Sequence, residues 1–171
     1  TSELKDMQTV TSDTLAYIEK MKKLGNKYLI GQTTGFEALD KKTTGFNEGD
    51  LVIIAARPAM GKTALVLNMA LKNVERGKGV IFFSLEMPAE QLMLRMLAAK
   101  TSIPLQNLRK GDMDDKEWSN LSAAFDDLNS KKLFVDDGGS ININQLRARV
   151  RKLAQIQENN ISLVIIDYLQ L

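Results

Sequence analysis

Four short apolar runs, separated by stretches of helical character, constrain the fold of this chain more than any other feature. The runs are LVIIAA (51–56), GVIFFSLE (79–86), KLFVDD (132–137) and SLVIIDYLQL (162–171). Each predicts a buried strand, and the sequence between them predicts helices over 62–76, 88–100, 114–129 and 143–157. Strands that are apolar on both faces and alternate with helices favour an α/β fold with a mostly parallel sheet covered on both sides. Ligands of such sheets bind beyond the carboxyl ends of the strands.

Two details refine these helices. Pro88 is predicted at the first position of its helix, where a missing N–H costs nothing. In the helix over 143–157, Leu146, Val150 and Leu153 are predicted to face inward. Further upstream, TTGF occurs at 33–36 and 43–46, which is too short to indicate a repeat, and the segment FEALDKK (36–42) predicts a short helix.

The N-terminal segment predicts one more helix, over about 12–24. The sequence TSD at 11–13 offers N-caps, and Gly25 is a natural end. The apolar stripe of this helix is narrow and consists of Leu15, Ile18 and Met21. Two interpretations stay open: the stripe packs on the chain's own domain, or it docks on a neighbouring subunit.

Composition excludes several kinds of chemistry. The chain has 171 residues, 44% of them apolar, which suits one soluble domain that buries about 70% of its unfolded surface. It contains no histidine and no cysteine, so catalytic triads with a histidine base, disulfides and the usual zinc sites are impossible. No apolar run approaches the ~20 residues of a membrane span, and no signal peptide leads the chain. We expect a cytoplasmic protein without a membrane partner. The net charge of +2 does not decide for or against nucleic acid.

The stretch AARPAMGKTAL (55–65) joins the first predicted strand to the first long helix. It resembles the phosphate-loop pattern G-x-x-x-x-G-K-[ST], with Ala56 in place of the first glycine. The backbone amides would point at a phosphate, Lys62 would meet the β and γ phosphates, and the Thr63 hydroxyl would bind magnesium. Ala56 would be tolerated if its φ is negative. The predicted nucleotide-binding residues are Ala59, Met60, Gly61, Lys62, Thr63 and Ala64.

A nucleotide hydrolase also needs acidic residues at the same edge of the sheet. Asp167 ends the run LVIID and is the predicted magnesium ligand beside Thr63. Glu86 ends the strand that follows the phosphate-loop helix and is the predicted water-activating carboxylate; the alternative is that it caps the helix at Pro88. Asp136 and Asp137 also end a strand, and we expect them to form the next turn.

The segment LRARVRK places four cations on one helix: Arg147, Arg149, Arg151 and Lys152. Such a helix is usually a solvated face, and a contact with a phosphate backbone or a subunit is the minority interpretation.

Three separated stretches, ARPAMGKT, FFSLEMP and LVIIDYLQL, closely resemble the motor domain of the bacterial replicative DNA helicases of the DnaB family. TGFEALDKKTTGFNEGDLVIIAARP extends the match upstream, and alanine at the first loop glycine is usual in that family. The resemblance implies a linker helix region over 1–27 and the N-terminal part of a RecA-like motor over 28–171. It further implies a homo-hexameric ring that hydrolyses ATP with Mg²⁺ and translocates on single-stranded DNA. Primase and a helicase loader are the implied partners in the primosome.

The same resemblance assigns roles to individual residues. Lys62 and Thr63 bind nucleotide and magnesium, Glu86 is the catalytic carboxylate, Asp167 is the acid at the strand end, and Gln170 is a sensor of the nucleotide state. The family's N-terminal collar, DNA-binding loops and arginine finger are absent from these 171 residues. Because the apolar run reaches Leu171, we expect a fragment of a longer protein, and we expect this fragment alone to hydrolyse ATP weakly or not at all.

Two other functions stay open on the residues alone. A P-loop kinase would need an arginine-rich lid, which the sequence does not suggest. A non-catalytic nucleotide-binding helicase loader would not need a water-activating acid such as Glu86.

Overall fold

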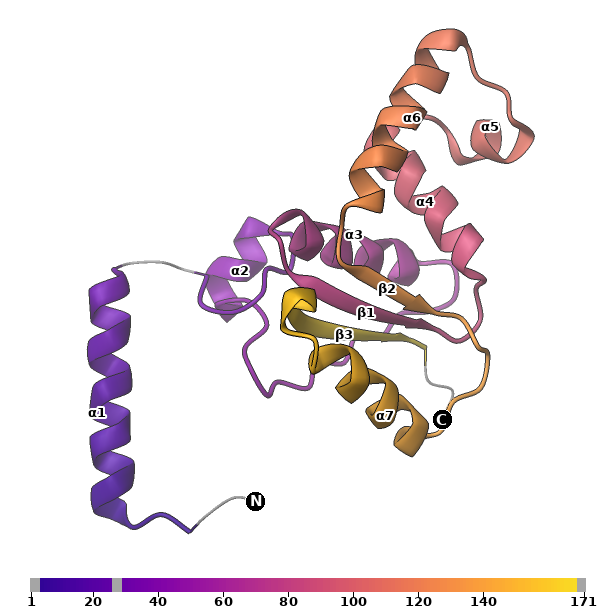
Figure 1. The fold of residues 1–171 in the computed structure, drawn as a ribbon. Coiled ribbons are helices and arrows are strands. Elements are labelled where there is room, and N and C mark those ends of the chain that lie inside the picture. The colour runs from indigo at the N-terminus through magenta and orange to yellow at the C-terminus, as the bar shows by residue number, and fades with distance from the viewer. Residues whose placement is uncertain (1–3, 26–28, 169–171) are drawn as a thin grey trace.

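The computed structural model describes residues 4–25 and 29–168. Its sheet has three parallel strands in the order β2-β1-β3, with β1 at Gly79–Ser84, β2 at Leu133–Asp136 and β3 at Ile161–Asp167 (Figure 1). The predicted α/β fold with a parallel sheet is therefore confirmed. Strands β1 and β3 pair to the end, since Ser84 lies opposite Asp167. The carboxyl ends of these two strands consequently meet at one edge.

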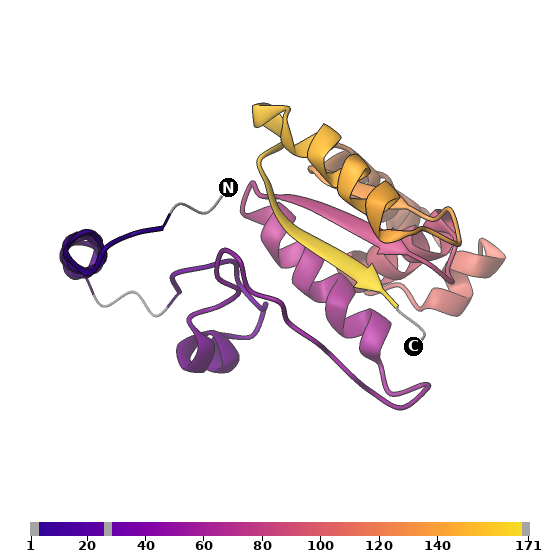
Figure 2. The same cartoon turned by 90° about the horizontal axis from the view of Figure 1, so that it is seen from below.

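Helices cover both faces of this sheet. Helix α3 (Lys62–Glu75) lies on one face and α7 (Ile143–Ala154) on the other, as Figure 2 shows by placing the strands between them. The α3 side holds the larger core, in which Val80 and Phe82 of β1 pack against buried α3 residues such as Ala70 and Val74. On α7, the three residues predicted to face inward, Leu146, Val150 and Leu153, are half-buried.

Three further helices form an arm beside the sheet (Figure 1). They are α4 (Ala89–Thr101), α5 (Leu105–Lys110) and α6 (Asp115–Asn129), and a second small core joins them around Leu97 and Leu121. Pro88 is the N-cap of α4 rather than its first residue, so that prediction was off by one position. The sequence analysis did not predict α5. Short helices α2 (Glu37–Thr43) and η1 (Gln157–Asn159) complete the elements.

Helix α1 (Met7–Leu24) stands apart from the sheet and begins five residues before its predicted start. Its N-cap is Asp6, whose carboxylate accepts a hydrogen bond from the Thr9 amide at 2.8 Å. The predicted cap at 11–13 was wrong, because Thr11 lies inside the helix and donates to the Met7 carbonyl. Gly25 ends the helix with φ +73°, as predicted.

The predicted buried strand over 51–56 is not formed in the described residues. The segment is drawn as a coil (Figure 2), and the side chains of Leu51 and Ile53 are 88% and 82% exposed. Only Ile54 packs against the core. A strand needs a hydrogen-bonded neighbour, and within the described residues β3 pairs with β1 alone. The prediction of a buried strand over 51–56 was therefore wrong, because an apolar segment forms a strand only where it meets a pairing partner.

Candidate nucleotide-binding site

The phosphate-loop residues form a tight turn that leads directly into α3. Gly61 is the N-cap of α3 and has φ +84°, while Ala59 is also left-handed at φ +63°. A side chain at position 61 would meet nothing within 4 Å, so backbone conformation and not space favours glycine there. Ala56 is not among the described residues with positive φ, which removes the need for glycine at that position.

The turn exposes backbone donors at the start of α3. The first intrahelical bond there is the Leu65 amide to the Gly61 carbonyl at 2.9 Å. The amides of Lys62, Thr63 and Ala64 therefore lack an acceptor within the helix, and the helix dipole adds a partial positive charge. Such an N-terminus can hold an anion such as phosphate.

Asp167 joins the end of β3 to this turn. Its Oδ2 accepts a hydrogen bond from the Thr63 hydroxyl at 2.8 Å, and its Oδ1 lies 3.6 Å from the Lys62 ammonium nitrogen. The Asp167 backbone is held by the Leu85 amide, which donates to its carbonyl at 2.9 Å. The residue is only 8% exposed. Asp167 thus forms one polar cluster with Lys62 and Thr63, which lie more than a hundred positions earlier in the chain.

Glu86 lies two residues beyond β1, in an exposed turn at the same edge. The Ser84 hydroxyl shapes this turn by donating to the Met87 carbonyl at 2.6 Å. At the start of α4, the Ala89 amide donates to Asp137 Oδ2 at 2.8 Å. Both interpretations of Glu86, water activation and capping of α4, stay predictions.

Asp136 and the arginine-rich helix α7 are partners within the chain. Arg149 forms an ion pair with Asp136, and the Gly138 amide donates to the same carboxylate at 3.1 Å. Burial alone would raise the pKa of Asp136, but these hydrogen bonds and the charge of Arg149 hold it below its usual range. Asp136 therefore shapes the next turn, as predicted, whereas Asp137 accepts a hydrogen bond from the start of α4, which was not predicted. Arg147 and Arg151 are exposed, as expected for a solvated face.

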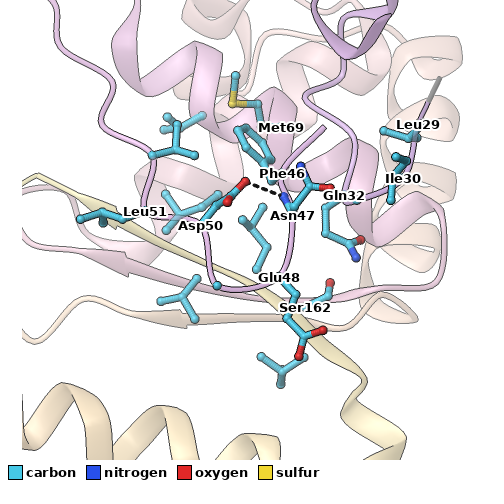
Figure 3. A pocket seen from close by; sticks show the side chains of 18 of the residues that line it. Leu29, Ile30, Gln32, Phe46, Asn47, Glu48, Asp50, Leu51, Met69 and Ser162 are labelled. Carbon is cyan, nitrogen blue, oxygen red and sulfur yellow. Dashed lines mark hydrogen bonds between the residues drawn. The ribbon is translucent and has the colours of Figure 1, made fainter. Parts of the chain in front are cut away.

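A cavity of about 1290 Å³ adjoins this cluster, and the sequence analysis did not predict it. Figure 3 shows part of its wall, where Asn47 and Asp50 of the loop before 51–56 are hydrogen-bonded at 2.9 Å. Its lining also includes Lys62, Asp167 and Tyr168. The cavity is also lined by Leu51, Val52 and Ile54 and by residues of strand β3.

The oxygen atoms of Thr63 and Asp167 in this polar cluster are suitable ligands for a hard cation. Among the described residues there is no group of three or more acidic, histidine or cysteine side chains that could hold a metal. The hydroxyl of Thr63 and the carboxylate of Asp167 are oxygen donors within 2.8 Å of each other. Magnesium is usually held by one or two protein oxygens together with substrate phosphates and water. The residues present therefore fit magnesium with a nucleotide and no dedicated metal cage.

Comparison with known proteins identifies the family. The family described as DnaB-like helicase C terminal domain matches residues 31–171. The chain belongs to the DnaB-like helicase family. Among curated DnaB-like relatives, the replicative DNA helicase DnaB of Helicobacter pylori is 44% identical over 98% of this chain and 34% of its own length. The replicative DNA helicase DnaC of Bacillus subtilis is 41% identical over 98% of this chain and 36% of its own length.

Solved structures of DnaB-like proteins share the fold. An ATPase domain superposes with a TM-score of 0.84 at 27% identity, covering 92% of this chain and 56% of that one. A DnaB-like replicative helicase, solved in a study of its interactions with primase, gives a TM-score of 0.80 at 27% identity and covers 90% of this chain and 38% of that one. The chain thus spans about a third of the length of its curated DnaB-like relatives. Its three-stranded sheet is RecA-like.

One predicted site residue of this DnaB-like chain is not described by the structure. Gln170, the predicted nucleotide sensor, lies outside the described residues. No helix in the described part of the chain is long and apolar enough to cross a membrane.

Proposed function

We propose that this chain is part of the ATP-hydrolysing motor of a ring-shaped replicative DNA helicase. The whole protein would translocate on single-stranded DNA and unwind the duplex at the replication fork. The observation that carries the proposal is the contact between Asp167 and the first turn of α3, where the carboxylate accepts a hydrogen bond from Thr63 at 2.8 Å and faces Lys62 at 3.6 Å. Membership of the DnaB-like family supports the same function.

The amides of 59–64 would bind the phosphates of ATP, helped by the dipole of α3. Lys62 would neutralise charge on the β and γ phosphates. Thr63 and Asp167 would hold Mg²⁺, and the bound ion would neutralise charge that develops on the phosphate oxygens. Glu86 would orient the attacking water and accept its proton. These residues divide binding and chemistry between a helix N-terminus and two strand ends.

The proposed assembly is a homo-hexamer in the cytoplasm. The names of the relatives support a role in DNA replication, and the DnaB-like helicase described with its interactions with primase supports primase as a partner. Single-stranded DNA and a helicase loader are partners that the family resemblance implies. We propose the linker role for 1–27 and the motor role for 28–171, and we keep Gln170 as a proposed sensor of the nucleotide state.

The test of the function uses the full-length protein with and without single-stranded DNA. We expect ATP turnover that rises with DNA, together with strand separation of a forked duplex. Lys62→Ala should weaken nucleotide binding and abolish turnover, because the phosphates lose their cation. The matched control is Lys72→Ala on the same helix. Lys72 is exposed, and among the described residues its one ion pair is with Glu75 at 3.5 Å. Unchanged turnover in Lys62→Ala would reject the phosphate-loop assignment.

A further inference from the structure

We infer that Tyr168 is a positioning residue that holds the Lys62 ammonium at the nucleotide site before nucleotide binds. The inference rests on the proposed function and extends it to a residue outside the loop and the acids. Its central observation is that the Lys62 ammonium nitrogen lies 3.6 Å from the centroid of the Tyr168 ring. This distance is well within the range of a cation–π contact.

The end of strand β3 determines where Tyr168 lies. Register pairing between β1 and β3 ends with Ser84 opposite Asp167, and the Leu85 amide donates to the Asp167 carbonyl at 2.9 Å. Tyr168 is the first residue beyond this anchored position and is half-buried. The ring is therefore presented from a rigid strand end and not from a long loop.

The Asp167 carboxylate alone interacts only weakly with the Lys62 ammonium. The distance from the ammonium to Asp167 Oδ1 is 3.6 Å, which is longer than an ordinary hydrogen bond. The other carboxylate oxygen, Oδ2, is already engaged by the Thr63 hydroxyl at 2.8 Å. The negative face of the tyrosine ring supplies a second attraction for the ammonium from a different direction.

Ordering matters because a lysine side chain has many rotamers. Each rotamer-rich side chain that becomes fixed on binding lowers the affinity, and one that is fixed beforehand does not. The Lys62 side chain is 22% exposed, so it is already withdrawn from most of the solvent. The ring should therefore tighten nucleotide binding by about 2- to 30-fold, the range expected for one cation–π contact.

The experiment measures binding of ATPγS with magnesium to the full-length protein by calorimetry. Tyr168→Leu removes the ring face and should raise the dissociation constant by about 2- to 30-fold. Tyr168→Phe keeps the ring face and should restore the affinity to near that of the parent. A tighter complex in Tyr168→Leu would overturn the inference, because the ring would then compete with phosphate for Lys62. Equal affinity of the leucine variant and the parent would also overturn it.

A double-mutant cycle distinguishes the positioning of Lys62 by Tyr168 from a purely structural role of Tyr168. In a Lys62→Met background, Tyr168→Leu should cause no further loss of affinity, because the cation that the ring positions is gone. The same loss in both backgrounds, with a lower unfolding temperature, would assign Tyr168 to packing and reject the inference.

The outcomes also distinguish this inference from the proposed function. If Lys62→Met itself leaves nucleotide affinity and turnover unchanged, the phosphate-loop function fails. If Lys62→Met weakens binding while Tyr168→Leu does not, the function stands and only the role of Tyr168 is rejected.

Discussion

At the scale of single residues, several carboxylates of this chain build the fold, whereas Glu86 is proposed to act on water and Asp167 to hold magnesium. Asp136 and Asp137 accept hydrogen bonds from backbone amides of a turn and of α4. Asp40 is 3% exposed and accepts hydrogen bonds from both Thr33 and Thr34. Glu86 lies in an exposed turn at the edge where the nucleotide site is proposed.

The first prediction concerns Glu86. In the full-length protein, Glu86→Gln should keep nucleotide affinity and lower the turnover number by about 10²- to 10⁴-fold, because the amide cannot accept the proton of water. Binding is measured with ATPγS and turnover with ATP. Glu90→Gln, on the exposed first turn of α4, is the matched control and should behave as the parent. Impaired folding of Glu86→Gln with lost binding would instead indicate a structural role.

The second prediction concerns Asp40. Asp40→Asn should lower the free energy of unfolding by about 2 kcal/mol at pH 7, because buried donors lose a charged acceptor. Burial alone would raise the pKa of Asp40, but hydrogen bonds from Thr33 and Thr34 and the charge of Arg76 hold it below its ordinary value. The stabilisation is therefore complete above the unfolded pKa, about 4, and is lost as pH falls through the lower folded value.

Urea unfolding at several pH values measures this effect. The difference between the parent and Asp40→Asn should shrink below about pH 4. Asp13→Asn is the control, since Asp13 is exposed and pairs with Lys5 at 2.7 Å; it should change stability by less than about 1 kcal/mol. A pH-independent difference for Asp40→Asn would show that its charge is not the source of the stabilisation.

At the scale of elements, neighbouring βα units are tied together by contacts between residues far apart in the chain. Asp137 follows β2 and accepts from the Ala89 amide at the start of α4, which follows β1. Asn73 of α3 donates to the Thr33 carbonyl in the loop before α2 at 2.8 Å. These contacts join loops to helices that are distant from them in the sequence. Helix α1 has no buried residue and takes no such part.

The third prediction therefore concerns α1. Its apolar residues Leu15 and Ile18 are 57% and 56% exposed, which favours docking on a neighbouring protomer over packing on its own domain. In the full-length protein, Ile18→Glu should shift the hexamer toward smaller species in sedimentation velocity. The unfolding temperature of the monomeric form should change little, because no residue of α1 is fully buried in its own chain. Ala16→Glu, on the opposite face of α1, is the matched control and should leave the hexamer intact. A stable hexamer in Ile18→Glu would argue against docking through this stripe.

At the scale of the whole molecule, we propose that this chain supplies only part of each ATP site of a ring. The family resemblance implies that an arginine of the next subunit completes each site. Within the described chain, Arg149 is engaged by Asp136, and α7 precedes the Asp167 strand. In other P-loop enzymes an arginine finger contributes about 10³ to 10⁵ in rate.

The fourth prediction follows from this incomplete site. The isolated 171-residue chain should bind nucleotide, hydrolyse it hardly at all and fail to translocate on DNA. A steady-state ATPase assay with and without single-stranded DNA, run beside the full-length protein, measures this. Turnover at the full-length rate would contradict the prediction, since the chain would then supply all its catalytic groups.

Much of the fold and of the proposed site could be predicted because its signals are local. The apolar runs of β1, β2 and β3 and the periodicity of α3 and α7 depend on neighbours in sequence. The loop before α3 was predictable for the same reason, since Gly61, Lys62 and Thr63 are consecutive. Because parallel strands end at the same edge of a sheet, the sequence could also predict Asp167 beside Thr63.

Tertiary structure alone decided the features that depend on a distant partner. Residues 51–56 have the composition of a strand and remain a coil, because strand formation requires hydrogen bonds to a neighbour that the segment does not meet. The acceptor at the start of α4 is Asp137, which lies 48 positions away and which no helix-capping pattern near Pro88 could indicate. The ring of Tyr168 over Lys62 likewise exists only because the end of β3 meets the start of α3. Sequence patterns report the conformations that a segment prefers, and the free energy of its contacts determines which partner it finds.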